Sequence, residues 1–392
     1  MVTMNERSAQ AGSQPAPATW VPVRAQMHDH AMTVADVPAS KFYRDASTFV
    51  ETYRDVAAYY GVDIASPVGD DYNYEVEAMG AKMIYGENSM PTIDFRDPLI
   101  KQPEDLYKLK TPDFRADGRL PYALECMKLR GGTRGTFCGV FSMAVGLRSY
   151  PAVVKDMRKR PEFAHDLFTF IVDRVLIPYL KVQREDCGIS AANGSEAWVS
   201  VPSLSVKEMH EWILPYYKRL VSKAADFGVR VVPGGGDYSE EDPAKFDPEV
   251  VKGAFDFQMF SRGGNFLTLG MGAWHLHPLE VVREYTAPYR ARGTRITITA
   301  GVNARILRDG PVEKIVSVVK RYVDAFARDH DLIILLANIP ADTRPEHVHA
   351  AIAATHTYGR IPIAGNLEGI DFRAPQRETY QQWRTQQPRA AR

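Results

Sequence analysis

Two hydrophobic patterns alternate along the chain. Apolar residues recur three and four positions apart in residues 45–60, 161–186 and 310–329, which is typical of helices buried along one side. Between such stretches lie short runs that are mostly apolar and often β-branched, as strands are. Eight runs of this kind are predicted as strands, at residues 20–23, 62–66, 135–141, 187–192, 229–232, 265–271, 295–302 and 331–336.

Eight short strands alternating with helices predict an α/β protein, a (β/α)8 TIM barrel. The last two strands, RITITAGV and DLIILL, are largely apolar, as expected of parallel strands covered by helices. The alternative is an open doubly wound sheet. No G-x-G-x-x-G follows a strand, so the common dinucleotide-binding form of that sheet is not expected.

The predicted barrel is a single domain, residues 19–365. Residues 1–18 are polar and rich in Ala, Pro and Ser, and are expected to be a disordered, flexible N-terminal tail. Residues 366–392 are predicted to be a loosely packed C-terminal tail. Residues 81–120 are irregular and rich in Pro and Asp, which indicates a long insertion after the second strand that covers part of the site.

The charge balance narrows the function classes. Lys+Arg and Asp+Glu both number 48, so the formal net charge is zero. A general nucleic-acid or membrane-surface binder needs a basic excess, and neither partner is expected. Three scattered cysteines do not suit a disulfide framework, and we expect a cytoplasmic protein.

The fifth strand opens into a glycine-rich loop. Val231 and Val232 end the strand at Pro233, and three glycines then lead to Asp237. In a parallel α/β fold this is the carboxyl end of a strand, where such folds carry their chemistry. The glycines let a ligand approach the backbone closely, and Asp237 adds a carboxylate. A tight turn that needs glycine only for its positive φ is the alternative.

Acidic residues follow two other strands. Glu196 comes after the fourth strand, near Trp198, and a carboxyl group at an apolar wall can have a raised pKa suited to proton transfer. The alternative is that Glu196 caps a helix or pairs with an arginine. Asp70 and Asp71 follow the second strand and precede Tyr72. They form either a solvated turn or a carboxylate site that orients a cationic or N–H-bearing ligand.

Two His-x-His pairs also lie after strands, His28 with His30 and His275 with His277. In an extended chain, alternate residues share one face, which suits a divalent metal ion. Polar loops near a helix cap are the alternative. The candidate site residues are Glu196, Asp237 and Asp71 as catalytic groups, His30, Tyr72, Trp198, Asn303 and Asn338 as substrate-binding groups, and His275 and His277 as metal ligands.

Several longer stretches carry a family resemblance. They include YGVDIASPVGDDYNYEVEAMGAK, KQPEDLYKLKTPDFRADGRLPYALECMKL, CGVFSMAVGL followed by RKRPEFAHDLFTFIVD, and TAGVNARILRDGPVEKIVSVVKRYV. In this order and spacing they resemble the uroporphyrinogen decarboxylase superfamily, including its corrinoid-dependent methyltransferase branch, over residues 45–360. The resemblance implies the same barrel, with the ligand at the carboxyl ends of the strands.

The resemblance carries over only part of the family's site. Asp71 falls where the porphyrinogen decarboxylases keep the aspartate that holds pyrrole N–H groups. Their arginine-rich stretch after the first strand is replaced here by QMHDHA. The zinc-binding positions of the thiol-alkylating methyltransferases read Val232, Gly234 and Ala337 in this chain. Either the metal site has moved, with His275 and His277 the best candidates, or the enzyme works without zinc.

What the resemblance implies is a methyl- or alkyl-group transferase. It would demethylate a small methylated donor, as in O-demethylation, and pass the methyl group to a cobalamin protein or to tetrahydrofolate. No Asp-x-His-x-x-Gly cobalamin motif is present, so a corrinoid would be carried by a partner protein. The alternatives are a metal-independent decarboxylase or lyase acting on a small cyclic acid, and a non-catalytic ligand-binding barrel. A homodimer is a further expectation.

Overall fold

Two parallel sheets organise the protein. The computed structural model describes residues 19–65, 72–270 and 272–387. Their contacts divide the chain into two compact units, one made of residues 1–36, 52–67 and 265–392 and the other of residues 37–51 and 68–264. We call them the terminal unit and the central unit. Helix α4 (Ala46–Tyr60) contributes residues to both.

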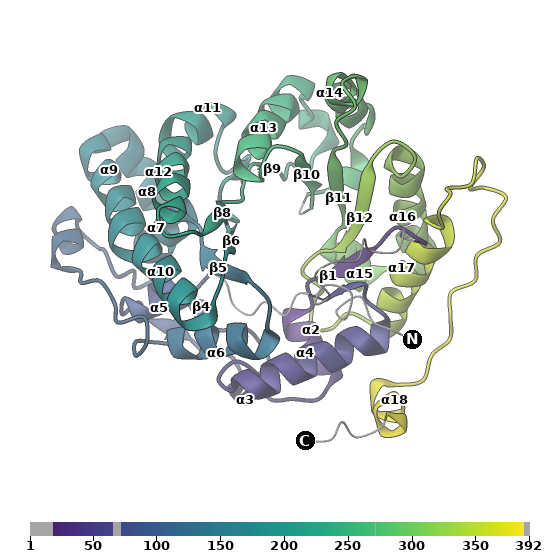
Figure 1. Cartoon of the computed structure of the whole chain (residues 1–392), viewed down its shortest axis with the longest axis horizontal. Coiled ribbons are helices and arrows are strands. Elements are labelled where there is room, and N and C mark those ends of the chain that lie inside the picture. Colours follow the sequence, from purple (N-terminus) through teal and green to yellow (C-terminus); the bar gives the residue numbers. More distant parts are fainter. Residues whose placement is uncertain (1–18, 66–71, 271, 388–392) are drawn as a thin grey trace. The chain divides into compact units, whose positions relative to one another are not determined.

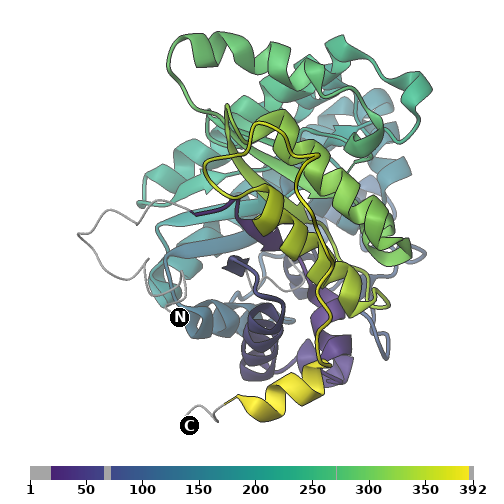
Figure 2. The same ribbon diagram turned by 90° about the vertical axis from the view of Figure 1, so that its right-hand side faces the viewer.

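The terminal unit has a five-stranded parallel sheet in the order β10-β11-β12-β1-β2. Ala25 of β1 pairs with Leu336 of β12 on one side and with Ala65 of β2 on the other, so these strands end at the same edge. Helices α16 and α17 pack on the sheet, as the yellow-green helices of Figure 2 show. The elements of this unit are β1 (Val23–Ala25), α2 (His28–Val34), β2 (Ile64–Ala65), β10 (Phe266–Leu269), η5 (Trp274–Leu276), α14 (Glu280–Ala291), β11 (Thr297–Val302), α15 (Ala304–Asp309), α16 (Val312–Phe326), β12 (Asp331–Leu336), α17 (Pro345–Tyr358) and α18 (Tyr380–Gln386).

The central unit has a three-stranded parallel sheet in the order β5-β6-β8. Helices α10 and α12 pack beside these strands (Figure 1). A short parallel pair, β7 with β9, joins the segments that follow β6 and β8. The elements of this unit are α3 (Ala39–Phe42), α5 (Tyr74–Ala78), β3 (Met83–Ile84), β4 (Thr92–Ile93), η1 (Pro103–Lys108), α6 (Leu120–Arg130), β5 (Arg134–Cys138), α7 (Val140–Arg148), α8 (Tyr150–Lys159), α9 (Pro161–Phe170), η2 (Ile171–Leu176), α10 (Ile177–Cys187), β6 (Ala191–Ser195), β7 (Ser200–Val201), α11 (Val206–Glu208), η3 (Met209–Ile213), α12 (Leu214–Ala225), β8 (Arg230–Val232), β9 (Asp237–Tyr238), η4 (Pro243–Lys245) and α13 (Pro248–Ser261).

The α/β class and its parallel strands are confirmed. Among the described residues the parallel strands pair in separate sheets of five, three and two strands, so the closed eight-stranded barrel stays a prediction, as do the single-domain division and the insertion. The helix predicted at residues 45–60 is found at Ala46–Tyr60. Within the described residues, none of the helices combines the length and the apolarity needed to span a bilayer.

The fourth strand was placed too early. It was predicted at residues 187–192 and lies at Ala191–Ser195. Cys187 is still helical, and Gly188 ends α10 in the left-handed conformation with φ of +69°. The true strand reads AANGS and has little of the apolar character that marks a buried strand in sequence.

The C-terminal tail, predicted to be loosely packed, is mostly exposed between residues 366 and 387 and contains one helix that packs on the protein. Helix α18 lies against α4 at the lower edge of Figure 2. The rings of Tyr380 and Trp383 each lie 5.6 Å from the ring of Tyr59, whose hydroxyl donates a hydrogen bond to the Glu378 carbonyl at 2.8 Å. The aromatic residues in an otherwise polar tail make this packing possible.

Candidate functional site

Glu196 is the best-defined chemical group at a strand end. It directly follows β6, and 5% of it is exposed. Its Oε1 accepts a hydrogen bond from the Ser142 backbone N–H at 2.6 Å. Its Oε2 accepts from the Phe141 N–H at 3.2 Å and from the Tyr217 hydroxyl at 2.9 Å. The carboxyl group therefore occupies the N-terminus of α7, where unpaired backbone N–H groups favour an anion.

The approach of Glu196 to α7 depends on Gly139. This residue joins β5 to α7, and its N–H donates to the Ser195 carbonyl at 2.8 Å. A Cβ atom at Gly139 would collide with the carboxyl group of Glu196. The sequence CGVFS therefore ends the strand, leaves room for the acid and starts the helix within a few residues.

Burial sets the protonation of this cluster. It raises the pKa of Glu196 from 4.5 to about 7, against the opposing effect of the hydrogen bonds from Ser142, Tyr217 and Phe141. Burial also raises the pKa of Tyr217 well above its ordinary range, so that its hydroxyl stays a neutral donor. Glu196 can thus both give and take a proton near neutral pH, as a general acid or base must.

The glycine-rich loop is held against the protein on its inner side. Gly234, Gly235 and Gly236 have φ of +86°, +76° and +85°. Added Cβ atoms would lie 2.6 Å from the Gly194 carbonyl oxygen, 3.0 Å from Val199 Cβ and 2.8 Å from a ring carbon of Phe257, respectively. The glycines are therefore explained by positive φ and close packing, which is the alternative that the sequence left open.

The loop carries Asp237 to the pairing of β9 with β7. Its Oδ2 accepts a hydrogen bond from Arg262 at 2.9 Å, in an ion pair whose side chains are 13% and 20% exposed. Burial raises the pKa of Asp237, and the charge of Arg262 opposes this rise. Arg262 also opposes the rise in the pKa of Tyr217, so its charge acts on both Asp237 and the hydrogen-bond donor of Glu196.

The first histidine pair is not extended. His28 and His30 lie in the first turn of α2, where residues two apart point in different directions. His30 is fully buried, and its Nε2 lies 2.8 Å from the Tyr60 hydroxyl. Burial lowers the pKa of His30 to about 4, which leaves a neutral imidazole. Its predicted contact with a substrate stays a prediction.

The second pair is also bent out of the extended form. His275 lies in the short helix η5, and His277 caps its end. The Arg321 guanidinium donates hydrogen bonds to the backbone carbonyls of both histidines. In the part of the chain that the structure describes, no group of three or more His, Cys, Asp or Glu side chains is placed to hold a metal ion. The predicted metal site has no third ligand there.

The remaining candidates divide by position. Asn303 caps α15, and its side-chain oxygen accepts from the Arg305 N–H at 2.9 Å. Asn338 follows β12 with φ of +43°, and its N–H donates to the Gln26 side chain at 3.4 Å. Trp198 stacks on Tyr150 with ring centres 5.0 Å apart.

Asp71 lies outside the described residues, and Tyr72 is half-buried at their edge. Among the described candidates, Tyr72, Glu196, Trp198 and Asp237 belong to the central unit. His30, His275, His277, Asn303 and Asn338 belong to the terminal unit.

Sequence reasoning missed three residues of the cluster, namely Tyr217, Arg262 and Ser142. Tyr217 is one of several buried aromatic residues on a helix, and nothing in its spacing connects it with Glu196. Arg262 follows the last residue of α13 in a polar SRGGN turn. Ser142 could have been found, because a serine three residues after a strand-ending glycine falls in the first turn of a helix.

Parallel sheets with a buried acid at a strand end place the chain among α/β proteins whose chemistry lies at the carboxyl ends of strands. The family model of uroporphyrinogen decarboxylase (URO-D) matches residues 5–358, and the chain belongs to this family.

The matches to curated relatives cover only about half of each relative. The chain is 32% identical over 187 residues to a uroporphyrinogen decarboxylase of Myxococcus xanthus, a match that covers 45% of this chain and 51% of the relative. It is 26% identical over 185 residues to that of Syntrophotalea carbinolica, covering 44% and 50%. The chain thus spans about half the length of the curated relatives it matches.

A solved structure shares the fold over much more of the chain. A methyltransferase from Methanosarcina mazei superposes with a TM-score of 0.65 at 18% identity, covering 86% of this chain and 94% of the methyltransferase. At this identity the likeness concerns the fold.

Proposed function

We propose that the chain is a methyl- or alkyl-group transferase in which Glu196 handles the proton of the demethylated group. The observation that carries the proposal is the burial of Glu196 at a strand end, with a pKa near 7 and donors on both oxygens. The shared fold with a methyltransferase supports it. The methyl acceptor would be a corrinoid on a partner protein or tetrahydrofolate.

The chain's own residues would act as follows. When a methyl group leaves an ether oxygen or an amine, the remaining heteroatom gains negative charge and needs a proton. Glu196 in its acid form supplies this proton. The carboxylate that results is stabilised by the N–H groups of Ser142 and Phe141 and by the Tyr217 hydroxyl. Asp237 stays paired with Arg262, so this ion pair adds no net charge near Glu196.

The family's zinc positions do not fit a metal in this chain. Val232, Gly234 and Ala337 have no side-chain donor atoms. These positions therefore cannot hold zinc, and elemental analysis of the purified protein tests for a relocated site at His275 and His277.

A decarboxylase or lyase is the second candidate. The curated relatives are named uroporphyrinogen decarboxylases, and an acid with a pKa near neutral can also protonate the carbanion that remains after loss of carbon dioxide. The same residue would then serve a different bond cleavage on a small cyclic acid.

The test is turnover of a panel of deuteromethyl ethers, amines and thiols, with cob(I)alamin or tetrahydrofolate as the methyl acceptor. Mass spectrometry follows the lost methyl group, and trapped carbon dioxide reports the alternative. We expect methyl loss, reduced at least about a hundredfold in Glu196→Gln and unchanged in Asp166→Asn, an exposed acid that also accepts from a tyrosine. Carbon dioxide without methyl loss would favour the decarboxylase, and binding without either product would favour the non-catalytic barrel.

A further inference from the structure

The two oxygens of Glu196 have unlike surroundings. Oε2 accepts hydrogen bonds from the Phe141 N–H and the Tyr217 hydroxyl. Oε1 accepts from the Ser142 N–H, and the Ser142 hydroxyl also hydrogen-bonds to the carboxyl group. A backbone N–H can only donate, so among these protein partners only a hydroxyl can accept the acid proton and relay it. The choice lies between Tyr217 and Ser142.

Tyr217 is a poor acceptor for this proton. It is fully buried in α12, and Glu196 Oε2 is the hydrogen-bond partner of its hydroxyl among the residues described. To accept a proton from Oε2, the hydroxyl would have to turn its own hydrogen into an apolar interior. A buried donor without an acceptor is strongly unfavourable.

Ser142 is the better acceptor for the acid proton of Glu196. Its side chain is a freely turning hydroxyl in the first turn of α7, and the residue is 6% exposed. The Trp198 N–H lies 3.5 Å from its oxygen. Trp198 belongs to the loop that follows Glu196, so the Ser142 hydroxyl contacts both the acid and the backbone of this loop.

We propose that Tyr217 is a positioning residue that keeps Oε2 as an acceptor, so that the acid proton of Glu196 sits on Oε1 and leaves through the Ser142 hydroxyl. The inference rests on the proposed role of Glu196 as proton donor. In the transfer, the Oε1–H bond breaks and the proton binds Ser142 Oγ. The former hydroxyl proton of Ser142 passes to the demethylated heteroatom, and Glu196 is left as the carboxylate. The serine is unchanged at the end.

Other titratable and charged groups face this pair. Arg262, which follows α13, and Cys138, at the end of β5, both act electrostatically on Tyr217. Both remain in place when the Tyr217 hydroxyl is removed. Changes measured in Tyr217→Phe therefore report the lost hydrogen bond.

Infrared spectroscopy can show directly which oxygen carries the proton. The C=O stretch of an acid falls in frequency when its carbonyl oxygen accepts a hydrogen bond. The band of protonated Glu196 is assigned by its absence in Glu196→Gln at mildly acidic pH. We expect Tyr217→Phe to raise this frequency, because Oε2 is the carbonyl oxygen, and Ser142→Ala to shift it much less. The matched control is Tyr216→Phe, whose hydroxyl lies 2.7 Å from His165 Nδ1 instead.

The reverse pattern, with the larger shift in Ser142→Ala, would overturn the inference, and so would equal shifts. Circular dichroism checks that the variants fold. If Tyr217→Phe does not fold, a large frequency shift in Ser142→Ala alone still contradicts the assignment of Oε2 as the carbonyl oxygen. In the methyl-transfer assay, Ser142→Ala should lower the limiting rate about ten- to a hundredfold. Tyr217→Phe should move the pH profile and keep the limiting rate. The expected infrared pattern without methyl transfer would refute only the proposed function, and methyl transfer with the reverse pattern would refute only this inference.

Discussion

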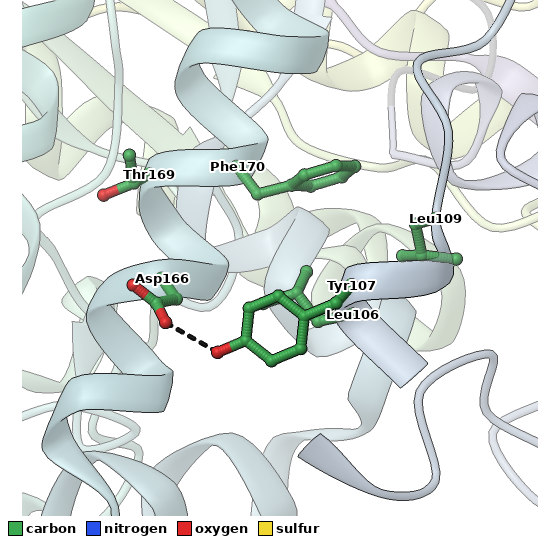
Figure 3. Close-up of a pocket in the computed structure, with 6 residues that line it drawn as sticks. All are labelled: Leu106, Tyr107, Leu109, Asp166, Thr169 and Phe170. Atoms are coloured by element: carbon green, nitrogen blue, oxygen red, sulfur yellow. Dashed lines mark hydrogen bonds between the residues drawn. The ribbon is translucent and has the colours of Figure 1, made fainter. Parts of the chain in front are cut away.

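Two tyrosine–carboxylate hydrogen bonds in the central unit have almost the same length and very different surroundings. Tyr217 donates to Glu196 at 2.9 Å and is fully buried. Tyr107 donates to Asp166 at 2.7 Å and is 67% exposed. Figure 3 shows the second pair among the residues that line a surface hollow of about 300 Å³, with Asp166 and Phe170 on α9 and Tyr107 on the facing segment.

The difference teaches that the environment, and not the length, decides what such a bond does. Burial is the main cause that raises the pKa of Tyr217, whereas for Tyr107 the main cause is the hydrogen bond to Asp166 itself. Around Tyr107, water can replace the tyrosine hydroxyl as a partner of the carboxylate. Around Tyr217 it cannot, so the protein must supply every partner of Glu196.

The largest expected effect comes from the loop that closes the buried region. Gly234→Ala would put a Cβ atom 2.6 Å from the Gly194 carbonyl oxygen at φ of +86°. Strain and overpacking together should lower the free energy of unfolding by about 3–4 kcal/mol.

Urea unfolding measures this cost, with Gly228→Ala as the matched control. Gly228 has a similar φ of +77°, and nothing lies within 4 Å of its added Cβ. The control should lose only about 1 kcal/mol. Equal losses at the two glycines would show that the loop around Glu196 is not tightly closed.

A second test uses the pH dependence of stability. The pKa of Glu196 is 4.5 ordinarily and about 7 in the folded protein, so the folded state binds more protons between these values. The stabilisation by this group is therefore complete at lower pH and is lost as the pH rises through 7. By linkage the loss amounts to about 3 kcal/mol.

The measurement is the free energy of unfolding between about pH 5 and 8 in the wild type and in Glu196→Gln. The decline assigned to Glu196 should be missing in the variant, while Asp166→Asn should keep the wild-type slope. A slope that survives in Glu196→Gln would place the titrating group elsewhere.

Periodicity predicted the helices of this chain well, because a buried stripe repeats over many residues. The helix at residues 310–329 is found at Val312–Phe326 with its apolar stripe buried. Short polar strands lack such redundancy, and the AANGS strand was therefore displaced by several residues. The extended backbone expected at the two histidine pairs was wrong for a related reason. Loops at strand ends were assumed to be extended, whereas His28 and His30 lie in α2, and His275 and His277 lie in and at the end of η5.

The candidate site was only half accessible from sequence. An acidic residue directly after a predicted strand can be recognised in the sequence, and Glu196 and Asp237 were chosen in this way. The partners that set its chemistry lie on other elements, and their contacts exist only after folding. Tyr216 and Tyr217 are neighbours in one helix, yet one hydroxyl lies against His165 and the other against Glu196. No spacing rule separates the two.

The smallest expected effect belongs to the exposed pair and sharpens the contrast. Tyr107→Phe removes the hydroxyl that donates to Asp166, and water then hydrates both the carboxylate and the space left behind. The free energy of unfolding should change by less than about 0.5 kcal/mol, with no change in its pH dependence. Thermal and urea unfolding beside Tyr217→Phe measure the difference under identical conditions. If Tyr107→Phe were as destabilising as Tyr217→Phe, hydrogen-bond length would be the better guide, and burial could no longer explain why Glu196 exchanges its proton near neutral pH.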